Sequence, residues 1–241
     1  MGVTAENLVD KYTISREDQD AFSFRSHMKA TAARDAGRLA QEIVQVNIPR
    51  RKQDDLIFEH DEFIKPDTTV EILSKLRPAF RKEGGSVTAG NSSGLNDGSA
   101  ALLLANESGL SSSGLTPLAQ IISSAVVGVE PRIMGIGPVR ASEIALKRAG
   151  ITFDDLDVIE LNEAFSAQAL ACIRAWGLDD DDSRINPNGG GISIGHPLGV
   201  TGSRILLAAA RQLERTGGKY GLVTLCIGVG QGYAVVIKNT Q

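Results

Sequence analysis

Cysteines, aromatic residues and long apolar runs are all scarce in this sequence. Cys172 and Cys226 are its only 2 cysteines, and neither has metal-ligand spacing with a histidine, which argues against a disulfide framework and a metal site. The longest apolar runs, such as 100–105 and 205–210, are far shorter than the ~18 residues that a membrane-spanning helix needs. The N-terminal residues lack the basic-then-apolar pattern of a signal peptide, so a cytoplasmic location without membrane contact is predicted.

The charge balance and the overall composition are those of an ordinary globular protein. The formal net charge is −4, and such a mildly acidic chain has no general electrostatic attraction for nucleic acid. Hydrophobic residues make up 42% and charged residues 22% of the 241 residues, which argues against a disordered or fibrous chain. A chain of this length can form one large domain or two of ordinary size, with a sizeable core in either case.

Strand and helix patterns alternate in the second part of the chain, after a Ser-rich linker near residue 115. Apolar segments predict strands, and segments with helix start and stop signals predict helices. The expected strands are 119–129, 157–161, 220–228 and 232–238, and the expected helices are 137–150, 162–177 and one that ends near Gly217. The last two strands are close enough in sequence to pair antiparallel. This alternation predicts an α/β fold with helices layered around a mostly parallel sheet.

The first part of the chain has a less regular pattern. Ser15, followed by apolar residues at helical spacing, predicts a surface helix that ends near Gly37. The alternation of Val44, Val46 and Ile48 predicts a half-buried strand. The charged stretch 50–63 has no clear period and is interpreted as a solvated loop, and the apolar run 99–105 as a helix or a buried strand.

His196 lies in a stretch, 186–204, that contains 6 glycines and 2 prolines. Pro197 biases the backbone of the preceding histidine toward an extended conformation, which orients its side chain. Thr201 or Ser203 can cap the helix that follows, and the positive end of that helix disfavours a protonated imidazole nearby. We therefore expect a neutral, fixed imidazole. A purely structural histidine in a tight turn is the alternative.

Polar groups also follow two of the expected strands. Cys226 lies where a strand gives way to "GVGQG", so its thiol is expected at the carboxyl edge of the sheet, where α/β proteins bind ligands. Gly228 leaves room for a substrate to approach a backbone N–H, which could serve as an oxyanion donor. Asn162 follows another strand, and His196 is expected at a similar strand-to-turn position, so one pocket could hold these two side chains together with Cys226. A buried strand cysteine and helix capping by Asn162 are the structural alternatives.

Five sequence blocks, in order, resemble those of the thiolase family (acetyl-CoA C-acyltransferases). They are "KLRPAF", "TAGNSSGLNDG", "NEAFSAQ", "GGGISIGHPLGVTGSR" and "CIGVGQG". The resemblance extends along the whole chain and implies two similar α/β halves, each with a mixed five-stranded sheet, and a loop domain over the substrate. It assigns 1–93 to a partial, coenzyme-A-binding loop domain and 116–241 to a complete C-terminal domain. Residues 94–115 would be the last strand and helix of a first half that is mostly missing.

The resemblance also implies roles for individual residues in a thiolytic acyl transfer of fatty acid metabolism. His196 would activate a nucleophilic cysteine that this chain lacks and, with a water held by Asn162, stabilise an enolate. Cys226 would exchange a proton at the acyl α-carbon, and the Gly228 N–H would complete an oxyanion hole. The substrate-binding positions implied are Ser93, Lys65, Met1 and Ala164. Coenzyme A is expected as a substrate, with no permanently bound cofactor, and the complete protein as a homodimer or homotetramer.

Three functional hypotheses remain open at this point. The first is a thiolase that cleaves 3-oxoacyl-CoA, or condenses acetyl-CoA in reverse, and that is inactive as the isolated chain. The second is a non-catalytic CoA-binding remnant, or one subunit of a split thiolase. The third is a condensing enzyme of the ketosynthase type. Cys226 and Gly228 argue against it, because the resemblance to that type of enzyme would imply two histidines at the corresponding sites.

Overall fold

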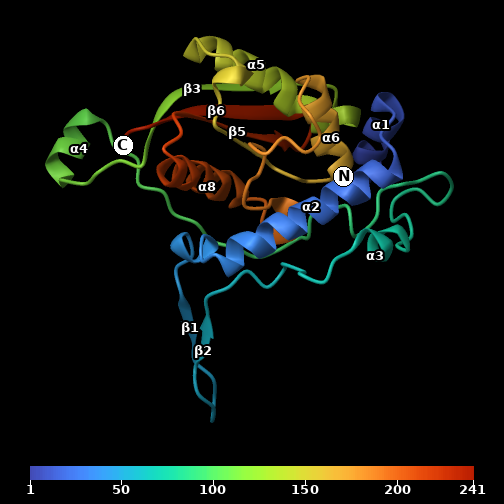
Figure 1. Cartoon of the computed structure of the whole chain (residues 1–241), viewed down its shortest axis with the longest axis horizontal. Coiled ribbons are helices and arrows are strands. Elements are labelled where there is room, and N and C mark those ends of the chain that lie inside the picture. Colours follow the sequence, from blue (N-terminus) through green and yellow to red (C-terminus); the bar gives the residue numbers. More distant parts are fainter.

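The computed structural model describes residues 1–241 and contains one four-stranded sheet with helices on both faces (Figure 1). The strand order is β3-β6-β5-β4. Its strands are β3 (Ala119–Gly128), β4 (Val158–Leu161), β5 (Tyr220–Ile227) and β6 (Gln231–Asn239). Only β4 and β5 pair in parallel, while β6 runs antiparallel to both β5 and β3. The four strands therefore lie where the sequence predicts them, in a mixed sheet.

The expectation of a mostly parallel sheet is wrong. β5 and β6 are joined by only three residues, 228–230, and so short a connection can only produce an antiparallel pair. A fifth strand, implied by the family resemblance, is reduced to an isolated parallel bridge between Ile159 and Ile185 beside β4.

Helices cover the sheet in two layers (Figure 1). On one face, α5 (Gly137–Ala149) packs against β3 and β6, and α6 (Ser166–Ala175) shares the larger core with it. On the other, α8 (Thr201–Thr216) packs against β4 and β5. Successive residues of β4 alternate between the layers, since Val158 contacts the α8 core and Ile159 the larger one. Each such fully buried aliphatic side chain stabilises the fold by roughly 1.5–3 kcal/mol.

The helix boundaries follow local sequence signals. Pro138 stands in the first turn of α5, and Gly150 ends it in the left-handed conformation with φ 71°. Gly217 ends α8 in the same way, with φ 70°. Short helical turns η2 (Pro131–Ile136), η3 (Phe153–Asp155) and α7 (Gly191–Ile194) occupy connections between the main elements.

The N-terminal part lies across one side of this body. It contains α1 (Gly2–Tyr12), α2 (Arg16–Asp35), η1 (Leu39–Gln41) and α3 (Val70–Ser74). The predicted N-cap is confirmed, because Ser15 Oγ accepts a hydrogen bond of 3.0 Å from the Asp18 N–H. α2 packs against α6 and α7, which brings the N-terminal part next to the loop that carries His196.

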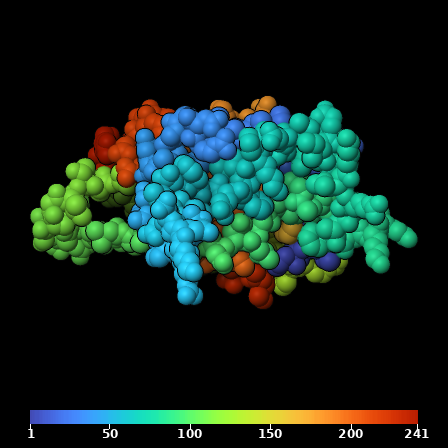
Figure 2. All heavy atoms as spheres, turned by 90° about the horizontal axis from the view of Figure 1, so that it is seen from below, coloured from blue at the N-terminus to red at the C-terminus, as the bar shows by residue number.

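Two segments of the N-terminal part differ from expectation. β1 (Val46–Ile48) and β2 (Leu56–Phe58) form a hairpin that projects from the body, so β1 is exposed rather than half-buried and 50–63 is not all loop (Figures 1 and 2). The apolar run 99–105 is neither helix nor strand, and Leu103 is 80% exposed, because no element of this chain covers it. α4 (Glu107–Ser113) is the regular element within 94–115.

No helix has the length and apolar character to cross a bilayer. No group of three or more His, Cys, Asp or Glu side chains is arranged to hold a metal ion.

Candidate active site

The backbone around His196 is fixed by contacts with a second loop. Gly195 has φ 107°, and a Cβ at this position would overlap Asn96 Oδ1, so only glycine fits. The His196 N–H donates a hydrogen bond of 3.1 Å to the Gly94 carbonyl. Loop 94–96 therefore holds His196 from one side, although the two segments are about a hundred residues apart in sequence.

The imidazole of His196 is bonded at both nitrogens. Nε2 lies 3.3 Å from Asn162 Nδ2, and Nδ1 lies 2.7 Å from Thr201 Oγ1. Burial lowers the pKa of His196 below 6.5, and the nearby Arg204 cation lowers it further. The ring is therefore neutral at pH 7, as the sequence predicts, and can act as a base.

The structure excludes the capping roles considered for Asn162, Thr201 and Ser203. α6 begins at Ser166, with Phe165 as its N-cap, so Asn162 is too early to cap it. The N-cap of α8 is Val200, which makes no side-chain cap bond, and the Thr201 hydroxyl instead donates 3.0 Å back to the Pro197 carbonyl. His196 also follows the short helix α7 rather than a strand, so its expected strand-end position is wrong.

Cys226 lies one residue before the end of β5 and is 7% exposed. Burial raises the pKa of its thiol to about 12, so the group is protonated at pH 7 and can act as an acid. It packs with Met134 and Ala164. Gly228 follows in the β5–β6 turn, and no atom lies within 4 Å of where its Cβ would be, so the backbone there is open to approach.

Ser93 and Ala164 are brought together beside Asn162. The Ser93 N–H and hydroxyl both donate to the Ala164 carbonyl at 3.1 Å, and the Ser166 N–H donates 2.9 Å to the Asn91 carbonyl. These bonds attach the loop of residues 91–93 to the segment that follows β4.

Lys65 and Met1 form their bonds elsewhere. The Lys65 N–H donates 3.3 Å to His27 Nδ1, and Lys65 Nζ lies 4.9 Å from the centroid of the Phe63 ring. Met1 is 64% exposed at the start of α1. Neither residue hydrogen-bonds to the group around His196.

Glu163 is a supporting residue, next to Asn162 after the strand, to which the sequence alone assigned no role. Its carboxylate is 2% exposed and accepts three hydrogen bonds: from Ser26 Oγ at 2.7 Å, Asn186 Nδ2 at 2.8 Å and the Ile192 N–H at 3.1 Å. It thus connects α2, the segment before α7, and α7 itself. An acidic residue in a buried apolar segment, directly after a strand, was the available signal.

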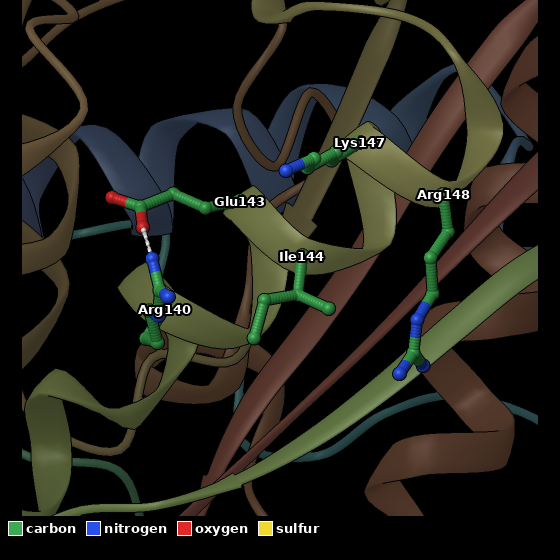
Figure 3. Close-up of a pocket in the computed structure, with 5 residues that line it drawn as sticks. All are labelled: Arg140, Glu143, Ile144, Lys147 and Arg148. Atoms are coloured by element: carbon green, nitrogen blue, oxygen red, sulfur yellow. Dashed lines mark hydrogen bonds and ion pairs between the residues drawn. The ribbon is translucent and has the colours of Figure 1, made fainter.

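One surface hollow is on another part of the molecule. Figure 3 shows it on the outer side of α5, lined by Arg140, Glu143, Ile144, Lys147 and Arg148. These five residues form one stripe of a single helix, so they wall only one side of the hollow. α5 and α8 cover opposite faces of the sheet, which places this hollow far from the start of α8 and from His196.

Two family models match the chain. The thiolase N-terminal domain matches residues 1–108 and the thiolase C-terminal domain matches residues 115–239. The chain belongs to the thiolase family. It is 53% identical over 239 residues to the β-ketoadipyl-CoA thiolase of Pseudomonas aeruginosa and 52% identical to the acetyl-CoA acetyltransferase of Chromobacterium violaceum. Each alignment covers 99% of this chain, but only 59% and 60% of those thiolases.

Solved thiolase structures have the same fold as this chain. The acetyl-CoA acetyltransferase of Bacillus anthracis superposes with a TM-score of 0.95 at 46% identity, over 99% of this chain and 60% of that one. Human mitochondrial 3-ketoacyl-CoA thiolase superposes with a TM-score of 0.94 at 46% identity, over 99% of this chain and 59% of that one. The thiolase-like α/β fold is confirmed, and the chain spans about three fifths of the thiolases it matches.

Proposed function

We propose that this chain provides one part of a thiolase active site, for thiolytic cleavage of a 3-oxoacyl-CoA or the reverse Claisen condensation of acetyl-CoA. The observation that carries the proposal is the neutral His196, held between Asn162 and Thr201 in a chain of the thiolase family. The protonated Cys226 thiol, near the end of the interior strand β5 and packed against Ala164, supports it. Acyl-CoA and coenzyme A are the proposed substrates, without a permanently bound cofactor.

Each group has a defined proton to move in the proposed reaction. His196 Nε2 accepts the proton of a nucleophilic cysteine thiol, which lies in the part of the thiolases that this chain does not span. The thiolate attacks the 3-oxo carbon, and the bond between the α- and β-carbons breaks to give an acyl-enzyme and an acetyl-CoA enolate. Cys226 donates its proton to the enolate carbon. The thiol of coenzyme A then gives its proton to the Cys226 thiolate and displaces the acyl group as a new thioester, while the proton held by His196 returns to the released nucleophilic cysteine.

Other groups would stabilise charge and bind substrate. A water on Asn162 with His196, and the Gly228 N–H, would donate hydrogen bonds to the two oxyanions. Ser93 and Ala164 lie beside Asn162, which supports their contact with the thioester arm. The proposed contacts of Lys65 and Met1 with the substrate depend on the family resemblance alone.

The purified 241-residue chain is expected to show no CoA-dependent cleavage of acetoacetyl-CoA. Both of its cysteines are buried with raised thiol pKa values, so neither forms the thiolate that attacks the substrate. The measurement is the loss of acetoacetyl-CoA on addition of coenzyme A. Robust turnover by this chain alone would contradict the assignment of the nucleophile to another segment.

The same assay, on a fusion, tests the proposed function. The preceding segment of the Pseudomonas aeruginosa β-ketoadipyl-CoA thiolase, joined ahead of this chain, should restore cleavage of a 3-oxoacyl-CoA. The buried thiols also fit the second candidate, a CoA-binding remnant or a subunit of a split thiolase. Calorimetric binding of coenzyme A by a folded but inactive fusion would favour the remnant and overturn the catalytic proposal.

A homo-oligomer is proposed from the exposed hairpin. The antiparallel register places Val46 opposite Phe58 and Ile48 opposite Leu56, so one face carries four exposed apolar side chains. Exposed apolar patches of this kind mark protein interfaces.

A cytoplasmic location is also proposed. So is the division at about residue 115, which the limits of the two family matches support.

Phe58→Asp is expected to weaken self-association about tenfold or more, because a charge would be buried in the interface. Sedimentation velocity over a concentration series measures the effect. Ile57→Asp is the matched control, since Ile57 is also exposed but points to the opposite face of β2. A wild-type chain that remains a compact monomer would contradict the oligomer.

A further inference from the structure

We propose that Thr201 is a positioning residue that fixes the tautomer of His196, with the ring proton on Nδ1 and the lone pair on Nε2. This inference rests on the proposed role of His196 as the base that activates the nucleophile. It adds a residue that, from the sequence, is expected to be only a helix cap.

The direction of the hydrogen bonds follows from what each group can donate. A threonine hydroxyl has one proton, and Thr201 donates it to the Pro197 carbonyl at 3.0 Å. The oxygen lone pairs of Thr201 are then free to accept from His196 Nδ1, at 2.7 Å. Thr201 is 0% exposed, so water does not compete for this bond.

The contact at the other ring nitrogen agrees with this direction. In the amide orientation of the structure, Asn162 Nδ2 faces Nε2 at 3.3 Å and can only donate, so Nε2 is the acceptor there. The opposite tautomer would place the Nε2 proton against the amide hydrogens of Asn162. Both contacts therefore favour a proton on Nδ1 and a lone pair on Nε2.

This tautomer is the one that the proposed reaction needs. The lone pair on Nε2, which accepts from Asn162 Nδ2 in the resting site, is the one that takes the thiol proton, and the Nδ1–H bond to Thr201 persists when the ring becomes an imidazolium. A ring held at both nitrogens also cannot flip. Thr201 acts only through His196 and has no bond to the proposed substrate.

Nitrogen NMR of the isolated chain tests the inference without any turnover. In ¹⁵N-histidine-labelled protein at a pH above the His196 pKa, His196 should show a protonated, pyrrole-like Nδ1 and a pyridine-like Nε2. The chain has 3 histidines, and the signal missing from His196→Gln identifies the correct one. His60, whose side chain is 68% exposed, gives the reference signal of a solvent-exposed imidazole.

Thr201→Val keeps the shape of the side chain and removes only its oxygen. One hydrogen bond corresponds to about a tenfold preference, so the tautomer ratio should fall by about tenfold in this variant. Thr201→Ser retains the hydroxyl and should behave as wild type. In an active fusion, Thr201→Val should lower kcat with little change in KM. Thr201→Ser should retain the wild-type kcat.

Two results would overturn the inference. One is a wild-type His196 with its proton on Nε2, which needs no variant and is decisive even if Thr201→Val does not fold. The other is a folded Thr201→Val with the wild-type tautomer ratio. Failure of the fusion to cleave 3-oxoacyl-CoA, with the Nδ1–H tautomer observed, would instead count against the proposed function.

Discussion

Glu163→Ala is expected to reduce the free energy of unfolding by about 3 kcal/mol, because buried donors lose an acceptor and the missing side-chain atoms leave a cavity. The substitution leaves the Ile192 N–H without its acceptor and removes one of the partners of Ser26 and of Asn186, and each unpaired buried group costs roughly 1–3 kcal/mol. Natural domains are stable by only about 5–15 kcal/mol, so a large share of the total would be lost.

Urea unfolding measures this effect as a shift of the midpoint at constant slope. The stability of Glu163→Gln should lie between those of wild type and Glu163→Ala, because its amide keeps one oxygen but turns an NH₂ toward Asn186 Nδ2 or the Ile192 N–H, which can only donate. Glu143→Ala is the matched control, since Glu143 forms an exposed ion pair of 3.0 Å with Arg140 and should change stability by less than about 1 kcal/mol (Figure 3). Equal stability of Glu163→Ala and Glu143→Ala would show that the Glu163 network is not structural.

In a fusion that has recovered turnover, Cys226→Ala should block proton exchange at the α-carbon of acetyl-CoA by ~10²-fold or more, yet still form an acyl-enzyme. The reason is that Cys226 is the proposed acid/base, whereas the nucleophile lies in another segment. His196→Ala should impair both steps, since His196 is proposed to activate the nucleophile and to stabilise the enolate.

Deuterium wash-in on acetyl-CoA and the mass of the acyl-enzyme are the two measurements. Cys172→Ala is the matched control, because Cys172 is equally buried but donates its thiol proton to the Gly135 carbonyl at 3.3 Å, within the larger core. Normal wash-in by Cys226→Ala would mean that Cys226 is a buried strand cysteine without a catalytic role.

Elements with local sequence signals were predicted well. The Ser15 cap, the Pro138 start of α5 and the glycines at 150 and 217 each act within a few residues, so the sequence alone locates them. The antiparallel pairing of β5 and β6 was predicted from their short connection and is confirmed, but the antiparallel pairing of β3 with β6 was not, because it depends on contacts between segments about a hundred residues apart. The run 99–105 shows the same limit, since its apolar side chains form no element without a surface to cover them.

The candidate site was predictable in part. Family blocks and extended backbone before Pro197 indicated His196, and the structure places it next to Asn162. Thr201 was expected to cap α8, because capping is the usual local bond of a threonine at a helix start. Its actual partner is a ring five residues earlier, on a loop that turns back only because Gly195 takes φ 107° and fits against Asn96.

The strand order also determines when the C-terminal sheet can be completed during synthesis. β3 is the first strand of this sheet to emerge from the ribosome. Its only neighbour in the sheet is β6, which is the last of the four strands to emerge. α5, which packs on both, therefore lacks part of its supporting surface until β6 has been translated. Such long-range pairing leaves nascent apolar strands exposed until their partner emerges, the period in which chaperones protect a chain from aggregation.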